Sequence, residues 1–251
     1  MLMEKRRKIV ILTGLAAVGV AVLFLFEGDI WEKSDIKKEK AVEQAEVKGQ
    51  DQTAQEAPTQ APLPQNINLQ VPFTTQAPFA NWDHAHEEAC EEAAILMVNR
   101  FLKSKPITGP QDAENEILDL QKFQRQYFGF FESTTAQETA TLIKKYYGYT
   151  NVEVKYDPTI QDIKEAVASG YPVILPAAGR KLGNPNFKSP GPLYHMLVVR
   201  GYRESTFITN DPGTRKGKEY VYSFDALYGA IGDWNAGNPS QGRKVMIVVK
   251  K

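Results

Sequence analysis

The chain has 251 residues, of which 42% are apolar, and its 30 basic side chains balance its 30 acidic ones. This apolar content suffices for a sizeable core, and the neutral balance provides no basic footprint for a nucleic acid. A single cysteine, Cys90, excludes an internal disulfide, so any exported part of the chain must be held by its core.

Residues 1–26 predict a membrane anchor. Basic residues at positions 5–8 precede an uncharged, largely apolar run from Ile9 to Phe26, which is just long enough to span a bilayer as a helix. Because basic residues stay on the cytoplasmic side, we expect a cytoplasmic N-terminus and an extracytoplasmic remainder. A cleaved signal peptide, and hence secretion, is the alternative, but no small-residue cleavage site follows Phe26, which favours an uncleaved single-pass anchor.

Residues 27–66 predict a disordered tether. They are rich in Glu, Lys, Gln and Ala and then in Pro, and they hold few large apolar residues that could form a core. Residues 67–251 are close to neutral in charge and have the size of one domain. We expect this domain to be a monomer that binds no nucleic acid.

Within 67–251 the patterns predict helices first and strands later. A short strand at 67–73 and a polar loop at 74–83 lead to the expected helices, at 90–102, 111–126, 135–147 and 160–169. Strands are expected at 173–175, 195–202, 206–209, 219–223 and 244–249, with a short helix at 225–231. This order predicts an α+β domain in which a helical N-terminal half packs on an antiparallel sheet, with a cleft between the two lobes.

Cys90 is the first candidate for a reactive group. The helical spacing of Ala94, Met97 and Phe101 places Cys90 in the first turn of a buried helix, where free N–H groups and the helix dipole favour a thiolate. The adjacent glutamates, at positions 87, 88, 91 and 92, would raise the thiol pKa if they pointed at the sulfur. The alternative is a buried structural cysteine.

His195 and Asp211 are candidates for the other members of a catalytic triad. A cysteine nucleophile needs a base and a group that orients this base. His195 begins an apolar strand after a loop rich in Gly, Pro and Asn, and Asp211 ends the next strand of an expected hairpin. Antiparallel pairing would bring both to one end of the sheet, although each residue also has an ordinary structural interpretation, in a turn or in the core.

Together these features resemble family thirty-nine of the cysteine peptidases, typified by the bacteriocin-processing domains of peptide-exporting transporters. The matching motifs are Val71-Pro-Phe-Thr-Thr-Gln76, Glu88-Ala-Cys-Glu-Glu-Ala93, Tyr194-His-Met-Leu-Val-Val-Arg-Gly-Tyr202 and Asn210-Asp-Pro212. The resemblance covers residues 67–251 and implies a papain-like fold. It also implies that no cofactor is needed.

The resemblance implies a role for each matching residue. Cys90 would attack the scissile carbonyl, His195 would act as base and then acid, and Asp211 would orient His195. Gln76 is the best match for the oxyanion donor, together with the N–H of Cys90. The sequence departs from better-known members, which keep a glutamine closer to the cysteine and a Cys-Gly-Pro or similar turn at the nucleophile.

Other polar and aromatic residues are weaker candidates. Trp82, Tyr194 and Asn210 are expected to contact substrate, and the loop from Gly179 to Pro192 could form a flap over the cleft. His84 and His86 could bind a metal, but this spacing has low specificity, so we predict no metal site.

The sequence therefore predicts a membrane-anchored, extracytoplasmic cysteine peptidase that cleaves peptide or amide bonds of a peptide or protein substrate. One alternative is a transglutaminase-like acyl transferase that uses the same triad. Another is an inactive papain-like module that binds surface or cell-wall peptides.

Overall fold

The computed structural model describes residues 62–251. Its centre is an antiparallel sheet in the order β2-β7-β3-β4-β5-β6, and β1 pairs with the far end of β4. The strands are β1 (Asn66–Asn68), β2 (Val152–Tyr156), β3 (Val173–Ala178), β4 (Tyr194–Arg203), β5 (Thr206–Asn210), β6 (Tyr220–Ser223) and β7 (Val245–Val249). The long central strand β4 carries the motif that begins with His195.

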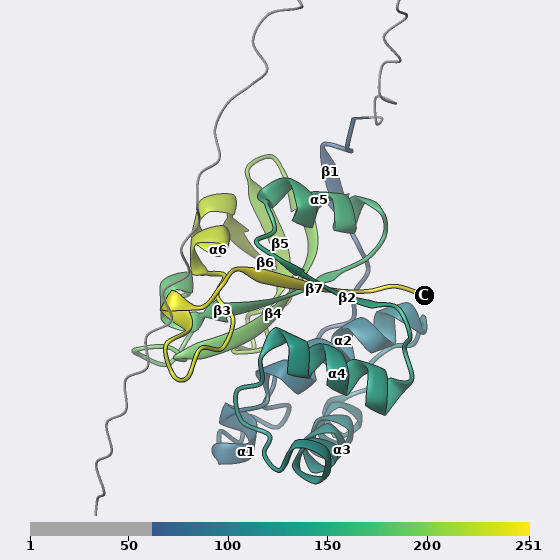
Figure 1. The fold of residues 1–251 in the computed structure, drawn as a ribbon, viewed down its shortest axis with the longest axis vertical. Coiled ribbons are helices and arrows are strands. Elements are labelled where there is room, and N and C mark those ends of the chain that lie inside the picture. Colours follow the sequence, from purple (N-terminus) through teal and green to yellow (C-terminus); the bar gives the residue numbers. More distant parts are fainter. Residues whose placement is uncertain (1–61) are drawn as a thin grey trace, which may run out of the picture. The chain divides into compact units, whose positions relative to one another are not determined.

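Helices cover both faces of this sheet (Figure 1). On one side lie α1 (His84–Glu87), α2 (Cys90–Leu102), α3 (Pro110–Phe128) and α4 (Ala136–Tyr147), and on the other lie α5 (Ile160–Ala168) and α6 (Phe224–Ala230). Two short 3₁₀ turns, at Gly179–Leu182 and Pro239–Gln241, complete the regular structure of this part of the chain. The helical N-terminal half therefore packs on an antiparallel sheet, as predicted.

The alternation of side chains along β4 divides the core into two parts. Tyr194, Met196 and Val198 belong to the cluster that contains α2, whereas Leu197 and Val199 belong to the cluster that contains α5. All of these side chains are buried, which is why the strand reads as a continuous apolar run in the sequence.

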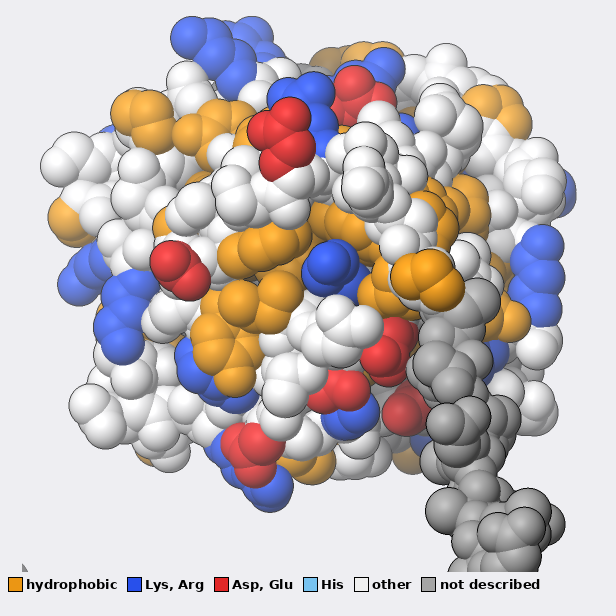
Figure 2. Space-filling model, turned by 90° about the horizontal axis from the view of Figure 1, so that it is seen from above, with side chains coloured by type: hydrophobic (Ala, Val, Ile, Leu, Met, Phe, Trp, Pro, Cys, Tyr) orange, Lys and Arg blue, Asp and Glu red, His pale blue; other side chains and the backbone are white. Residues whose placement is uncertain are grey.

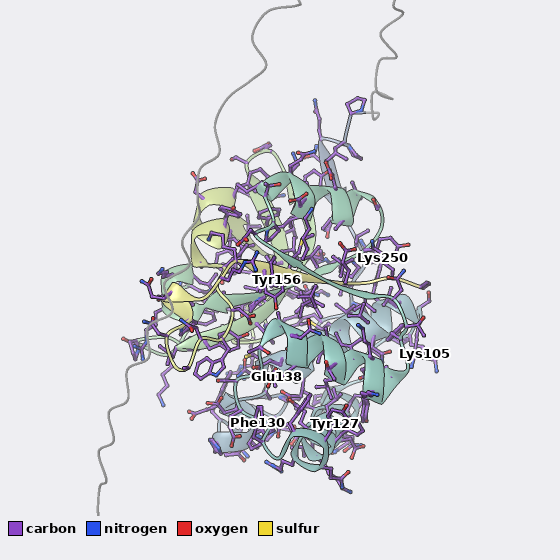
Figure 3. The ribbon with its side chains drawn as sticks, viewed as in Figure 1. Lys105, Tyr127, Phe130, Glu138, Tyr156 and Lys250 are labelled. Atoms are coloured by element: carbon purple, nitrogen blue, oxygen red, sulfur yellow. The ribbon has the colours of Figure 1, made fainter. Side chains whose placement is uncertain are left out.

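Local signals fix the ends of α4. Thr135 accepts a hydrogen bond from the N–H of Glu138, and the Glu138 carboxylate accepts one from the N–H of Thr135. Glu138 lies in the first turn of α4 (Figure 3), and Gly148 ends the helix in the left-handed conformation. This capping box and its glycine stop bound the helix that the sequence predicted at 135–147.

The structure also differs from the predicted elements. The first strand is confined to β1, because after Asn68 the chain leaves β4 and crosses to the helical side as a loop. The short helix α1 and the strand β2 were not predicted, and β2 interrupts the series of helices expected between residues 90 and 169. β2 is an edge strand that pairs with β7, and Val152 and Val154 pack on the same core cluster as α4.

Two predicted segments lie outside the described residues, namely the membrane anchor at 1–26 and most of the tether at 27–66. Among the helices that are described, none combines the length and the apolar character needed to cross a membrane. On the face of the molecule shown in Figure 2, acidic and basic side chains are interspersed among hydrophobic and uncharged ones. That face thus carries no field of a single sign.

Candidate active site

Cys90 is the first residue of α2, and its side chain is 5% exposed. Its backbone N–H lies in the first helical turn and has no acceptor among residues 62–251. Its Sγ–H donates to Oε2 of Glu91 at 3.0 Å. The nucleophile candidate is therefore correctly placed at a helix N-terminus, but its thiol is bound to a carboxylate.

Glu91 and Glu92 are both buried, in contrast to the usual exposure of acidic residues in a first helical turn. Burial, followed by the charge of Glu91, raises the pKa of Cys90 well above its ordinary value. Burial also raises the pKa of Glu91 to about 7, although hydrogen bonds from Cys90 and from backbone N–H groups lower it. In this conformation the thiol is the stable form of Cys90 at neutral pH.

His195 and Asp211 form a buried, hydrogen-bonded pair, in which Nε2 lies 2.8 Å from Oδ1. The hairpin of β4 and β5 brings them together, because Asn210 at the end of β5 pairs with Val198 near the start of β4. Sequence reasoning predicted this juxtaposition. Because Asp211 binds Nε2, the other ring nitrogen, Nδ1, is the one that could take a proton from a sulfur.

Three further groups hold the carboxylate of Asp211. Tyr222 donates to Oδ2 at 2.6 Å, Asn184 donates to the same oxygen at 3.2 Å, and the N–H of Gly213 donates to Oδ1 at 3.0 Å. Burial raises the pKa of Asp211, but the charge of His195 and these hydrogen bonds outweigh it and hold the pKa below its ordinary value. Asp211 is thus a fixed anion beneath the imidazole.

Cys90 and His195 have different packing neighbours. Cys90 packs in the cluster of Tyr194, whereas the ring of His195 contacts Phe187, which packs on the opposite cluster. Within the described part of the chain, the single hydrogen bond of the thiol goes to Glu91, and none joins it to His195. The structure therefore joins two of the three predicted triad residues by a hydrogen bond and leaves Cys90 without a hydrogen bond to either of them.

A cleft of about 990 Å³ opens beside these groups. Cys90 and Glu91 lie in its wall, as do Gly213 and Phe187, which both contact the ring of His195. Trp82 and Tyr194, two predicted substrate contacts, line it too, as do residues 185–192 of the predicted flap. His195 itself is 1% exposed and lies behind this wall.

The lining of the cleft carries charges of both signs. Glu87 and Glu88 lie at the end of α1, and three basic side chains lie in the loops that follow β3 and β5, namely Lys188, Arg215 and Lys216. None of these five residues forms an ion pair with another residue of the described segment. Their charges are therefore available to a bound molecule.

The family model described as the Peptidase_C39 like family matches residues 68–238. The chain belongs to this family. It is therefore a cysteine peptidase, and the resemblance that the sequence motifs indicated is confirmed. No curated protein matches the chain.

The chain is also similar to solved structures. A protein assigned as a C39-like peptidase from Bacillus anthracis is 16% identical, with 74% of this chain and 98% of that chain covered and a TM-score of 0.50. Xylellain, a cysteine protease from Xylella fastidiosa, is 14% identical (76% and 87% covered, TM-score 0.37). The Carica candamarcensis cysteine protease CMS1MS2 is 13% identical (75% and 99% covered, TM-score 0.36). The first of these likenesses supports the papain-like fold of this C39-like peptidase.

Gln76, the predicted oxyanion donor, lies in the cleft wall near Cys90. Its side-chain N–H groups donate to the carbonyl oxygens of His86 and Glu87, at 2.8 and 3.0 Å, and its Oε1 is buried without a partner. Its backbone N–H donates to the carbonyl of Pro212, next to Asp211. Gln76 thus fastens α1 to the strand lobe, and its oxyanion role stays a prediction that requires its amide to leave these carbonyls.

Asn210, a predicted substrate contact, is fully buried and lies outside the cleft. Its amide donates to the carbonyls of Val71 and Pro72, both at 3.1 Å. Contrary to the prediction, this side chain holds the entering segment of the domain instead of facing a substrate. Its position directly before Asp211 gave a misleading signal, because successive residues of a strand point to opposite faces.

The two remaining histidines have structural environments. His84 is exposed and contacts Glu132 at 3.3 Å. His86 is buried, and its ring nitrogens meet Asp83 at 2.7 Å and Glu114 at 2.9 Å. Burial lowers the pKa of His86, but these two carboxylates outweigh it and raise the pKa above its usual value. In the described segment, no group of three or more His, Cys, Asp or Glu side chains is arranged to hold a metal.

Sequence reasoning missed Tyr222, Asn184 and Gly213. The alternation of β6 could have indicated that the Tyr222 side chain faces inward, but no local pattern marks Asn184. Gly213 is required by a close approach, since a Cβ there would lie 2.9 Å from Cε1 of His195.

Proposed function

We propose that the protein is a membrane-anchored, extracytoplasmic cysteine peptidase that hydrolyses peptide bonds through Cys90, His195 and Asp211. The observation that carries this proposal is the buried His195 and Asp211 pair, which lies behind the wall of a cleft that also has Cys90 in its wall. The family supplies the reaction class, and the predicted span at residues 9–26 supplies the location.

The proposed reaction proceeds in two steps. His195 takes the proton of Cys90 at Nδ1, the sulfur attacks the scissile carbonyl carbon, and the imidazolium protonates the leaving amine. A water molecule, activated by the same imidazole, then hydrolyses the thioester. The N–H of Cys90, free at the start of α2, would stabilise the negative oxygen in both steps.

The proposed reaction requires Cys90 to exchange its hydrogen bond to Glu91 for one to His195. A rotation about the Cα–Cβ bond is the smallest such change, because Cys90 already lies beside Tyr194, the neighbour of His195 in β4. Apo active sites commonly show long or misaligned catalytic contacts that tighten when substrate binds.

The charged walls of the cleft indicate the kind of peptide that fits. A substrate with a basic residue near Glu87 and Glu88 and an acidic residue near Arg215 and Lys216 would place each charge opposite its counterion. We propose peptides or protein segments of mixed charge as substrates of this C39-like peptidase.

The proposal is tested with the purified chain and a library of quenched fluorescent peptides of mixed charge. We expect hydrolysis that is lost in Cys90→Ala and reduced at least 10³-fold in His195→Ala, while His84→Ala, the exposed histidine, keeps full activity. Folding of each variant is checked by circular dichroism. Lack of hydrolysis of every peptide by a folded wild type would contradict the proposal.

Two other results would identify the alternative functions. Incorporation of an added amine in preference to water would assign the site to an acyl transferase. Peptide binding without turnover by the folded wild type would assign it to an inactive binding module.

A further inference from the structure

Glu91 stands in an unusual relation to the sulfur. A carboxylate that accepts the thiol proton at 3.0 Å opposes formation of the thiolate on which a cysteine peptidase depends. Removing this carboxylate from water also carries a cost, because Glu91 is 1% exposed. A side chain that both suppresses the nucleophile and is unfavourable to bury requires a physical explanation.

The other oxygen of Glu91 is fixed. Oε1 accepts a hydrogen bond from the N–H of Thr134 at 3.0 Å, in the loop between α3 and α4. The carbonyl of Thr134 in turn accepts the hydroxyl of Tyr194 at 2.9 Å. Glu91 is thereby held from β4 as well as from the helical lobe, and Oε2 is directed at the sulfur.

The surroundings of Glu91 make its charge sensitive to pH. The titratable and charged groups that face it or its neighbour are Cys90, Glu88, Glu92, Tyr194, Asp233 and Arg125. Of these, Arg125 alone is permanently positive, and its influence is on Glu92. Glu92 is fully buried and its Oε2 has no partner, as expected for a neutral carboxylic acid. Because Glu91 is buried and has no positively charged group of its own among these neighbours to offset it, a negative charge on Glu91 is tolerated only weakly.

We propose that Glu91 is a proton-holding residue that switches Cys90 between a latent thiol and a reactive thiolate. When Glu91 is ionised, it accepts the Sγ–H and keeps the proton on sulfur. When Glu91 instead takes this proton from the sulfur, its O–H donates to the resulting thiolate. The proposal rests on Cys90 as the nucleophile of the proposed function and adds a control in which the charge of Glu91 limits the rise in thiol reactivity as the pH increases.

The direction of the switch follows from the balance of charges. Above pH 7 the Glu91 carboxylate repels a thiolate in a water-poor site, and below it this repulsion is lost. Because the two groups compete for one proton, each must alter the proton affinity of the other by the same amount.

Alkylation by iodoacetamide tests the switch directly, since Cys90 is the single cysteine of the full chain and its thiolate displaces iodide. Glu91→Gln is the matched variant. With its amide oxygen on the N–H of Thr134, its NH₂ group would face the sulfur and donate to a thiolate. We expect alkylation about tenfold faster than in the wild type at pH 8, and within about threefold of it at pH 5.5.

Glu88→Gln serves as the control, because it removes a nearby charge that makes no hydrogen bond to the sulfur. We expect Glu88→Gln to change the alkylation rate less than Glu91→Gln does, and by a factor that varies little with pH. The proposal would be overturned if the alkylation rate of Glu91→Gln relative to the wild type were the same at both pH values. It would also be overturned if Glu88→Gln changed the alkylation rate as much as Glu91→Gln does.

A second measurement keeps the proposal testable if Glu91→Gln does not fold. In Cys90→Ala, loss of the thiol donor should raise the pKa of Glu91 further, which isotope-edited infrared spectroscopy of the carboxyl band can follow. An unchanged or lower pKa would contradict the exchange of a proton with sulfur. Neither measurement requires peptide hydrolysis, so the two proposals can fail separately. The role of Glu91 can be wrong while His195 and Asp211 prove essential for hydrolysis. Equally, Glu91 can control the thiol of a protein that hydrolyses no peptide.

Discussion

The side chains of His195 and Asp211, 16 residues apart in the chain, meet with Nε2 2.8 Å from Oδ1. The antiparallel pairing of β4 and β5 creates this contact, and the burial of both residues shields it from water. A charge pair in such a place is strongly coupled, so removal of one partner should affect both activity and stability.

Asp211→Asn should lower kcat/KM about 10³- to 10⁴-fold, because the amide no longer favours the imidazole tautomer and imidazolium that the reaction uses. The variant should also unfold more easily at pH 7, by about 3 kcal/mol. The pKa of Asp211 lies below its unfolded value, so its stabilising effect is present above about pH 4 and is lost as the pH falls through the folded pKa. Urea titrations should therefore show a smaller difference in unfolding free energy between the wild type and Asp211→Asn at pH 3 than at pH 7.

Asp119→Asn, on the exposed surface of α3, provides the control for these titrations. It should leave both kcat/KM and the unfolding free energy within experimental error. An Asp211→Asn variant that is as active as this control would remove Asp211 from the proposed triad.

Tyr222→Phe should have a smaller effect in the same direction. Its hydroxyl donates to Oδ2 of Asp211 at 2.6 Å, and loss of one such bond to a charged group costs about 1.5–3 kcal/mol. We expect reduced stability and a fall of about tenfold in kcat with little change in KM, because the carboxylate is less firmly held. The control is Tyr220→Phe on the same strand, because the Tyr220 hydroxyl forms no hydrogen bond within the described residues. This variant should change neither stability nor kcat.

Gln76→Ala should distinguish fastening from oxyanion stabilisation. Both side-chain N–H groups donate to α1 carbonyls, so we expect a clear loss of stability, by about 1–3 kcal/mol, and a loss of less than tenfold in kcat. Thermal unfolding and steady-state kinetics measure the two effects separately. A loss of 10²-fold or more in kcat at unchanged stability would instead assign the oxyanion role to this amide.

Charge reversal in the cleft should alter substrate preference. The double variant Arg215→Glu/Lys216→Glu should raise KM several-fold for peptides with an acidic residue and lower it for basic analogues, with kcat much less affected. The effect should weaken in high salt because both side chains are exposed. Lys218→Glu, in the same loop but outside the cleft lining, is the matched control, and an equal shift there would refute a binding role for the other two.

Local patterns were sufficient to predict most of the regular structure and the family of this C39-like peptidase. Helical spacing placed Cys90 at the start of α2, Thr135 and Gly148 marked the ends of α4, and the turn between β4 and β5 implied the meeting of His195 with Asp211. Each of these inferences depends on residues near one another in the chain or on the fixed geometry of a hairpin.

Tertiary packing decided which side chains face the reaction. Whether Glu91 pointed at the sulfur or at solvent, whether Asn210 faced the cleft or the core, and which groups held Asp211 all depended on distant segments. Thr134 orients Glu91 from 43 residues away, and the loop and strand that carry Asn184 and Tyr222 reach Asp211 across 27 and 11 residues. Sequence periodicity describes one element at a time, whereas burial and the polarity of a site are set by the elements that pack against it.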